Sequence, residues 1–236
     1  MLYNLPIQNI LFLDIETVPM TENYEQLPEH IRELWDKQSR KLSTQEEQSP
    51  AELYSSAGLF AEFGKVICIS VGYMANQEFR VKSFYGEDEA LLLDEFAEML
   101  NQYFTGNENF LCAHNGKEFD FPFIARRLLI NDIKLPDILN TAVLKPWQVR
   151  FIDTMELWKF GNYRKYTSLN LLTAVFDIPT PKDDIDGSQV REIYYKEQDL
   201  ERIKNYCQKD VIATFQLYRR FVGEKLMPGE HISFVT

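Results

Sequence analysis

The sequence predicts an α/β protein with a mixed five-stranded sheet flanked by helices and a helical insertion after the first strand. Two observations indicate this class. Three β-type segments follow one another before residue 86, and helical and β-type segments then alternate along the rest of the chain. No linker rich in Pro, Gly or Ser interrupts the pattern, so a single domain over residues 1–236 is expected.

The first strand is expected at residues 10–15, where an uninterrupted apolar run is typical of a central strand buried on both faces. The polar stretch that follows, residues 19–62, is too long for a simple loop and has helical composition in two places. Because this insertion leaves directly from the first strand, we hypothesise that it gates a site at the end of that strand.

The two helices of the insertion are expected at residues 29–41 and 50–60. Ser49 and Glu52 have the spacing of a capping box, and Pro50 between them suits the first helical position. This spacing predicts that the second helix begins at Pro50.

The remaining elements follow from the period of their apolar residues. β-branched and apolar runs predict strands at residues 65–75, 78–85, 109–114 and 150–154, with a hairpin turn at residues 75–77. Apolar stripes at helical spacing predict helices at residues 88–104, 119–131, 155–160, 167–176 and 199–221. Residues 183–198 are expected to be loop-rich with one short helix.

Composition limits the partners of the protein. The formal net charge of −11 argues against broad, non-specific binding to a nucleic-acid backbone, although it is compatible with gripping a short single-stranded end. The three cysteines lack the spacing of a disulfide framework or a zinc site. Without a secretory signal or an apolar run of roughly 20 residues, the chain is expected to be soluble and cytoplasmic, with no membrane partner.

Five side chains in three segments are the candidate functional residues. Asp14 and Glu16 end the first strand two residues apart, so both should lie on one face of the sheet. Asp120 falls in the first turn of a helix, and Tyr206 and Asp210 stand one turn apart on the last helix. Each acid alone is equally typical of a strand end or a solvated helix, so the prediction depends on their conjunction.

Clustered acids cannot all stay charged unless a cation lies among them. The usual cations at such a cluster are a pair of divalent metals, and the usual chemistry is phosphodiester hydrolysis. The four carboxylates and the phenol therefore predict a metal-dependent hydrolase.

The chain resembles the DEDD exonuclease superfamily, in the subclass with tyrosine in its third motif. The likeness lies in Leu13-Asp14-Ile15-Glu16-Thr17, in His114-Asn115 with Phe119-Asp120, and in Tyr206-x-x-x-Asp210. Within that superfamily the chain is most similar to the predicted 3′-5′ exonucleases related to the proofreading domain of family B DNA polymerases, and the likeness includes residues 65–72 and 186–190. Since no polymerase domain follows, a stand-alone nuclease is expected.

The resemblance implies a ribonuclease H-like fold and removal of one nucleotide at a time from the 3′ end of single-stranded or unpaired DNA. It implies that two divalent cations, Mg²⁺ or Mn²⁺, are held by Asp14, Glu16, Asp120 and Asp210, which offer the hard oxygen ligands that these ions prefer. Tyr206 would orient the attacking water.

The resemblance also implies contacts to the substrate strand. Backbone around Thr17 and Val18 would meet the terminal nucleotide, and Asn115 would contact the strand. Apart from the resemblance, one of the two aromatic residues that flank Asp120, Phe119 or Phe121, could face a nucleobase, and Phe119 is the candidate. The basic residues that could reach phosphates are Arg126, Arg127, Lys145, Arg150, Arg164 and Lys165.

Two other functions stay open at this point. An exonuclease acting on RNA 3′ ends, similar to ribonuclease D, would carry the same tyrosine, and discrimination of the sugar would depend on contacts to the 2′-hydroxyl. A nucleic-acid-binding module that has lost catalysis would lack at least one acid, whereas all four are present here.

Overall fold

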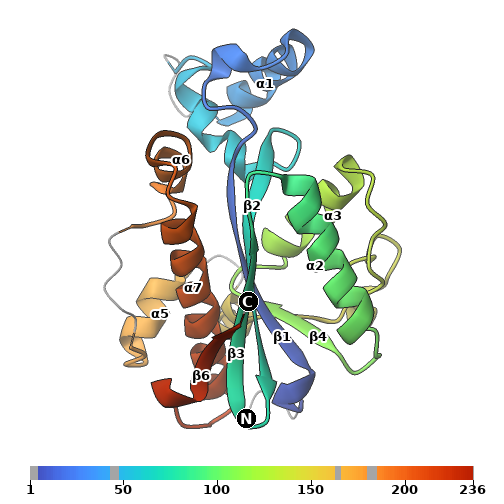
Figure 1. Ribbon diagram of the computed structural model, residues 1–236, viewed down its shortest axis with the longest axis vertical. Coiled ribbons are helices and arrows are strands. Elements are labelled where there is room, and N and C mark those ends of the chain that lie inside the picture. Colours follow the sequence, from blue (N-terminus) through green and yellow to red (C-terminus); the bar gives the residue numbers. More distant parts are fainter. Residues whose placement is uncertain (1–4, 43–47, 163–165, 180–184, 236) are drawn as a thin grey trace.

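The computed structural model describes residues 5–42, 48–162, 166–179 and 185–235, and these form a sheet covered by helices on both faces (Figure 1). Among these residues six strands lie in the order β5-β4-β1-β2-β3-β6. Their bounds are β1 Ile10–Pro19, β2 Gly64–Ala75, β3 Glu78–Tyr85, β4 Phe110–Ala113, β5 Phe151–Asp153 and β6 Ile232–Val235. Pairs β1–β2 and β2–β3 are antiparallel, and pairs β1–β4, β4–β5 and β3–β6 are parallel. The predicted mixed sheet is therefore confirmed, with one strand more than expected.

The additional strand, β6, lies at the edge of the sheet and pairs in parallel with Phe79–Lys82 of β3. Four residues are at the lower limit at which an alternating strand pattern can be recognised in a sequence. The pairing that makes this segment a strand is with the first half of the chain, so local sequence did not indicate it.

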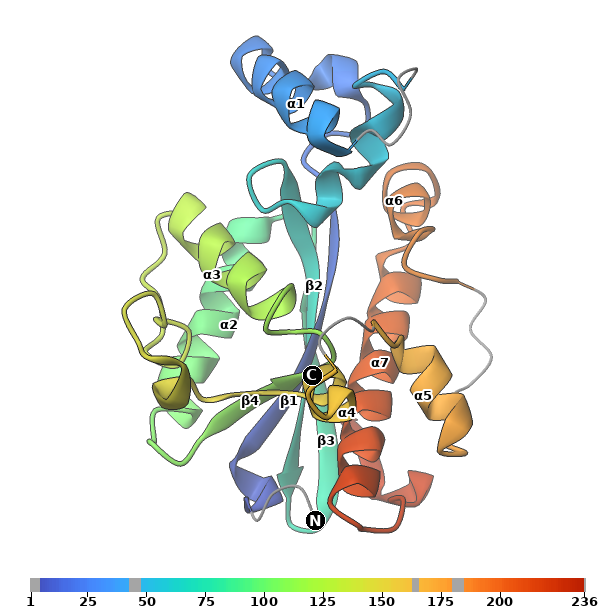
Figure 2. The same ribbon diagram turned by 180° about the vertical axis from the view of Figure 1, so that it is seen from behind.

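Two layers of helices sandwich the sheet. Helices α2 (Glu89–Tyr103) and α3 (Asp120–Ile130) cover one face, and α5 (Leu169–Val175) and α7 (Leu200–Phe221) cover the other, as opposite views show (Figures 1 and 2). The other described α-helices are α1 (Glu29–Leu42), α4 (Thr154–Lys159) and α6 (Val190–Glu192), and η5 (Ile193–Glu197) is a π-helix. The 3₁₀ helices are η1 (Ile7–Asn9), η2 (Tyr24–Gln26), η3 (Glu52–Leu59), η4 (Pro146–Gln148) and η6 (Gly229–His231).

The five helices predicted after the insertion are confirmed within two residues at each end. The described part of the loop-rich segment, residues 185–198, contains the short helix α6 and the π-helix η5. Over the described stretches of the chain, we find no helix with the length and apolarity needed to cross a membrane.

Helix α7 lies close against the sheet because one strand residue has no side chain. Ile203, Cys207 and Val211, each one turn from the next, are fully buried on its sheet-facing side. Opposite them, a Cβ at Gly72 would lie 2.2 Å from the ring of Phe79 and 2.8 Å from Val211 Cγ1. Glycine at this position therefore permits the close approach of α7 to β2.

The insertion forms a separate layer at the end of the sheet, beyond β1 and β2 (Figures 1 and 2). Its own apolar cluster is centred on Trp35, which is fully buried and packs edge-on against Tyr54 and Phe63. The Trp35 indole N–H donates to the carbonyl of Pro50 at 2.8 Å, which ties α1 to the start of the second helical segment.

The second helical segment differs from its prediction in one respect. The capping box is present: the Ser49 N–H donates to Glu52 Oε2 at 2.7 Å, and the Glu52 N–H donates to Ser49 Oγ at 3.3 Å. The segment is, however, a 3₁₀ helix that begins at Glu52 rather than at Pro50. Its two serines and Gly58 have lower helix propensity than alanine or leucine, and Gly58 lies so close to β1 that a Cβ would be 3.1 Å from the backbone of Val18.

Candidate active site

The alternation of side chains along β1 directs two acids toward α7. Ile10 and Phe12 of this strand belong to the apolar cluster under α7, whereas Leu11, Leu13 and Ile15 belong to the cluster under α2 and α3. Asp14 and Glu16 continue the first of these two series, since side chains two residues apart share a face. The predicted common face of the two acids is therefore the face that α7 covers.

Helix α7 brings Tyr206 and Asp210 to the same place. Cys207 lies between them in sequence, and its Sγ donates to the carbonyl oxygen of Asp14 at 3.3 Å. The Tyr206 hydroxyl hydrogen-bonds to Asp210. The third motif therefore lies against the first.

Asp120 reaches the cluster from the first turn of α3. The preceding turn has a tight bend, in which Asn115 adopts a left-handed φ of 67° and a Cβ on Gly116 would lie 2.4 Å from that of Ala113. Asp153 at the end of β5 holds this turn by accepting the N–H groups of Asn115 at 3.0 Å and Lys117 at 3.1 Å.

Asp153 is also the N-cap residue of α4. Its carboxylate accepts the N–H groups of Met155 at 2.9 Å and Glu156 at 3.2 Å. One buried acid thus fixes both the turn that leads to Asp120 and the helix that follows β5.

The acids of the cluster oppose one another's ionisation. Burial raises the pKa of Asp14 well above its usual value, and the charges of Asp210, Asp120 and Glu16 add to this effect. Burial followed by the charge of Asp210 likewise raises the pKa of Glu16. For Asp120, burial and the charges of Asp153 and Asp210 raise the pKa to about 7, against hydrogen bonding from backbone N–H groups that lowers it. Such a cluster either retains protons near neutral pH or binds cations.

The donor atoms suit a hard cation. One ligand oxygen each from Asp14 and Glu16 and the sulfur of Cys207 lie within 4.8 Å of one another. Burial raises the pKa of the Cys207 thiol well above its usual value, so in the metal-free protein the thiol is protonated and acts as a hydrogen-bond donor. The carboxylate oxygens of the cluster are ligands that suit a hard divalent cation.

Cys207 is a residue of the cluster that sequence reasoning missed. The available signal was its position beside Tyr206, on a helix face that an apolar stripe already marked as buried. The tyrosine itself is protonated, since burial first and the charge of Asp210 second raise the pKa of Tyr206 far above its usual value. In the metal-free protein its hydroxyl is therefore a hydrogen-bonding group.

A cleft of about 560 Å³ opens beside the cluster. Its walls come from the end of β1, the insertion, the start of α3 and the segment around α6 and η5. The lining residues include Glu16, Thr17, Ser55, Ser56, Leu59, Phe119, Ser188, Arg191, Tyr195 and Lys196. The cleft therefore joins the acid cluster to the insertion, as expected for an element that leaves directly from β1.

The four predicted substrate contacts have different surroundings. Thr17 and Phe119 line the cleft, and the Thr17 hydroxyl donates to the Gly58 carbonyl at 2.7 Å. The Val18 side chain is fully buried. Asn115 Oδ1 is buried and has no hydrogen-bond partner among the described residues.

One predicted phosphate contact is wrong. Arg127 is buried and forms a bidentate ion pair with Glu89, in which Nε lies 2.8 Å from Oε1. The Arg127 Nη1 also donates to the Ala61 carbonyl at 2.9 Å. This guanidinium holds α2, α3 and the end of the insertion together. Arg164 and Lys165 lie outside the described residues.

His114, directly after β4, has a structural role as a hydrogen-bonding residue. Its two ring nitrogens lie 2.9 Å from Thr154 Oγ1 and 2.9 Å from the Thr167 carbonyl oxygen. Burial lowers the pKa of His114, which favours the neutral ring.

A mixed sheet of this order, with acids gathered between β1, α3 and α7, defines an α/β protein of ribonuclease H-like fold. A family model described as "Predicted 3'-5' exonuclease related to the exonuclease domain of PolB" matches residues 59–230, and the chain belongs to this family. The matched range contains Asp120, Tyr206 and Asp210, while Asp14 and Glu16 precede it.

Among solved structures, the chain is similar to the family B DNA polymerase from the hyperthermophilic archaeon Pyrobaculum calidifontis. The TM-score is 0.59 at 16% sequence identity, over 92% of this chain and 25% of the polymerase chain. At this identity the likeness shows the fold alone. The chain thus corresponds to a quarter of the length of that polymerase.

Proposed function

We propose that the protein is a metal-dependent 3′-5′ exonuclease that releases nucleotides from single-stranded or unpaired DNA 3′ ends. The observation that supports this most strongly is the convergence of Asp14, Glu16, Asp120 and Asp210 with Tyr206 from three segments far apart in sequence. A structural role would not require acids that raise one another's pKa inside a buried cluster beside an open cleft.

The four carboxylates would hold two divalent cations, Mg²⁺ or Mn²⁺. Such ions supply Lewis-acid polarisation of a phosphoryl group and a water-derived nucleophile at neutral pH. Asp14 is the residue best suited to be shared, because the charges of all three other acids act on it.

The protein's own groups then orient the reactants. The Tyr206 hydroxyl, protonated and hydrogen-bonded to Asp210, positions the attacking water. Thr17 and Phe119 line the cleft beside Glu16, where the terminal nucleotide would bind. The single domain proposed for residues 1–236 would contain all of these groups.

The test is degradation of matched 5′-labelled single-stranded DNA and RNA with Mg²⁺ or Mn²⁺. We expect a ladder that shortens from the 3′ end, faster on DNA, and lost in Asp14→Ala. The control is Asp94→Ala, which removes an exposed acid of α2. Undiminished degradation by Asp14→Ala, or no degradation of either polymer by the metal-loaded protein, would refute the proposal, and faster degradation of RNA would reassign the substrate.

A further inference from the structure

One cation in the wall of the cleft has an N–H donor without an acceptor in the described part of the chain. Arg191 of α6 donates from Nη2 to the carbonyl of Glu22 in the insertion at 2.6 Å. Its Nε is buried and has no hydrogen-bond partner among the described residues. A buried guanidinium N–H without an acceptor is unfavourable, so this group is expected to meet an acceptor from a ligand.

The surroundings of Arg191 indicate what that acceptor is. Ser55 and Ser56 of the insertion line the same cleft, and the cleft also contains Glu16 of the acid cluster. Lys196 lines it too, with its ammonium 3.0 Å from the carboxylate of Glu192. A guanidinium that shares a cleft with hydroxyl groups is suited to a phosphate oxygen, which accepts several hydrogen bonds at once.

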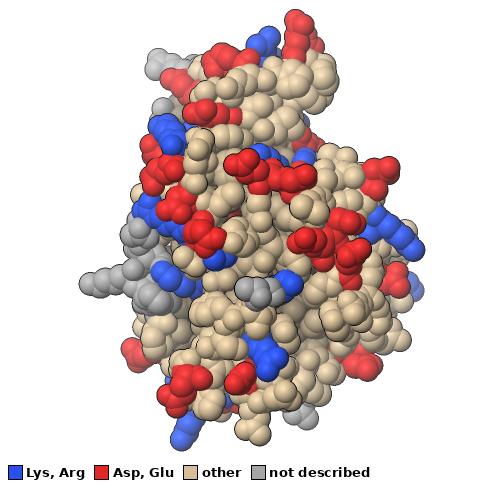
Figure 3. All heavy atoms as spheres, viewed as in Figure 1, with Lys and Arg blue, Asp and Glu red and all other residues tan. Residues whose placement is uncertain are grey.

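The acidic character of the protein makes the position of each cation important. Acidic side chains are spread over the face in view, and Lys and Arg form no continuous basic band on it (Figure 3). With a net charge of −11, contacts to phosphates depend on a few placed cations and not on a general basic surface.

We propose that Arg191 binds a phosphate of the substrate strand adjacent to the one that is cut. This inference rests on the proposed function, since it requires a nucleic-acid strand in the cleft. Helix α6 and the η3 segment of the insertion then form the two walls of the subsite that leads the strand to the acid cluster.

A purely structural role for Arg191 makes a different prediction. Its bond to Glu22 joins α6 to the insertion, so removal of the side chain could loosen the cleft without any lost phosphate contact. A loosened cleft would weaken the contacts to every phosphate of the strand. Loss of the Arg191 contact alone would weaken the contact to a single phosphate.

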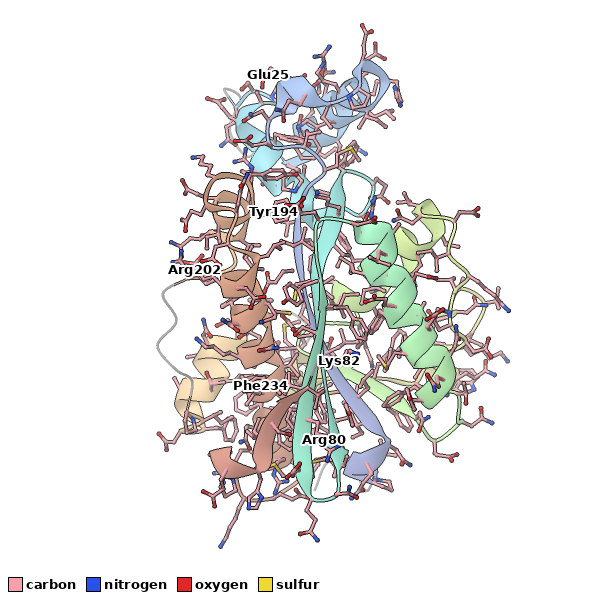
Figure 4. All side chains as sticks on the ribbon, viewed as in Figure 1. Glu25, Arg80, Lys82, Tyr194, Arg202 and Phe234 are labelled. Carbon is pink, nitrogen blue, oxygen red and sulfur yellow. The ribbon has the colours of Figure 1, made fainter. Side chains whose placement is uncertain are left out.

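The experiment measures binding of a short 5′-fluorescein single-stranded DNA by anisotropy, in Asp14→Ala protein so that no cleavage intervenes. Arg191→Gln is expected to lower the affinity about tenfold and to reduce the salt dependence by about one phosphate. Arg80→Gln is the matched control. Arg80 lies on β3 toward the opposite end of the sheet (Figure 4), carries the same charge, and should change the affinity less than about twofold.

A second series replaces one phosphate at a time by a neutral methylphosphonate. In protein that retains Arg191, a methylphosphonate at one linkage near the 3′ end should lower the affinity about tenfold. In Arg191→Gln protein, a methylphosphonate at that same linkage should leave the affinity unchanged. Identical profiles for the two proteins would overturn the inference while leaving the proposed function intact. Absence of any binding by the Asp14→Ala protein would count against both.

Discussion

The Sγ of Cys207 donates to the backbone carbonyl of Asp14 at 3.3 Å, so helix α7 and strand β1 are joined at the acid cluster itself. Tyr206 precedes this cysteine by one residue, and Asp210 follows it by three. Because a helix is rigid over one turn, this contact sets the distance of both residues from Asp14 and Glu16.

Replacement of Tyr206 by Phe should lower kcat about 10²-fold while Mn²⁺ binding is retained. The change removes only the hydroxyl that we propose to orient the water, and the ring is not a metal ligand. Steady-state kinetics on single-stranded DNA and calorimetric titration with Mn²⁺ separate the two effects. Tyr103→Phe, at an exposed position of α2, is the control, and full activity of Tyr206→Phe would exclude the assigned role.

The metal-free protein should lose stability as the pH rises from about 4 to about 7. The folded protein raises the pKa of the Asp120 carboxyl from 3.8 to about 7, so it holds this proton more tightly than the unfolded chain does. The stabilisation from this proton is complete at pH values below the pKa of Asp120 in the unfolded chain. It is lost as the pH rises through the pKa of Asp120 in the folded protein. The loss is on the order of 4 kcal/mol, at about 1.4 kcal/mol per pKa unit.

Urea unfolding in EDTA at a series of pH values measures this effect. Asp120→Asn should make the decline shallower, with the part that comes from the raised pKa values of Asp14 and Glu16 remaining, whereas Asp94→Asn should leave it unchanged, because Asp94 is exposed. Mn²⁺ should restore stability more at neutral pH than at pH 5, since the carboxylates must be deprotonated to bind it. An equally steep decline in Asp120→Asn would show that other groups cause it.

Replacement of Gly72 by Ala should destabilise the protein by about 1–3 kcal/mol, the usual effect of forcing one methyl group into a close-packed contact. The added Cβ would lie 2.2 Å from the Phe79 ring and would push α7 away from β2. Activity should fall as well, because α7 carries Tyr206 and Asp210. Urea unfolding and nuclease assays measure both effects. Gly229→Ala, where a Cβ meets nothing within 4 Å, should leave both properties unchanged.

Replacement of Arg127 by Met should destabilise the protein by about 3–5 kcal/mol, because it leaves Glu89 buried without its cation. Arg126 is the neighbouring residue on α3 and is exposed, so Arg126→Met should change the free energy of unfolding by less than about 0.5 kcal/mol. Equal effects of the two substitutions, measured by urea unfolding, would contradict the importance of the buried ion pair.

The sequence by itself determined the features that depend on backbone periodicity. The two-residue period of a strand directs Asp14 and Glu16 to one face, and the four-residue spacing on a helix aligns Tyr206 with Asp210. Apolar runs of strand or helix period likewise located the first five strands and the long helices, because each run must bury its own apolar face. Ser49 and Glu52 predicted their capping box for the same local reason.

Only the tertiary structure decided which distant groups meet. Cys207 at the acid cluster, Arg127 inside an ion pair, Arg191 in the wall of the cleft and the pairing of β6 with β3 all depend on packing between segments far apart in the chain. An arginine has the same local sequence signature whether it lies in a core, a cleft or the solvent. Its environment is set by the burial and charge of the neighbours that the fold brings to it, and these are not encoded in any short segment.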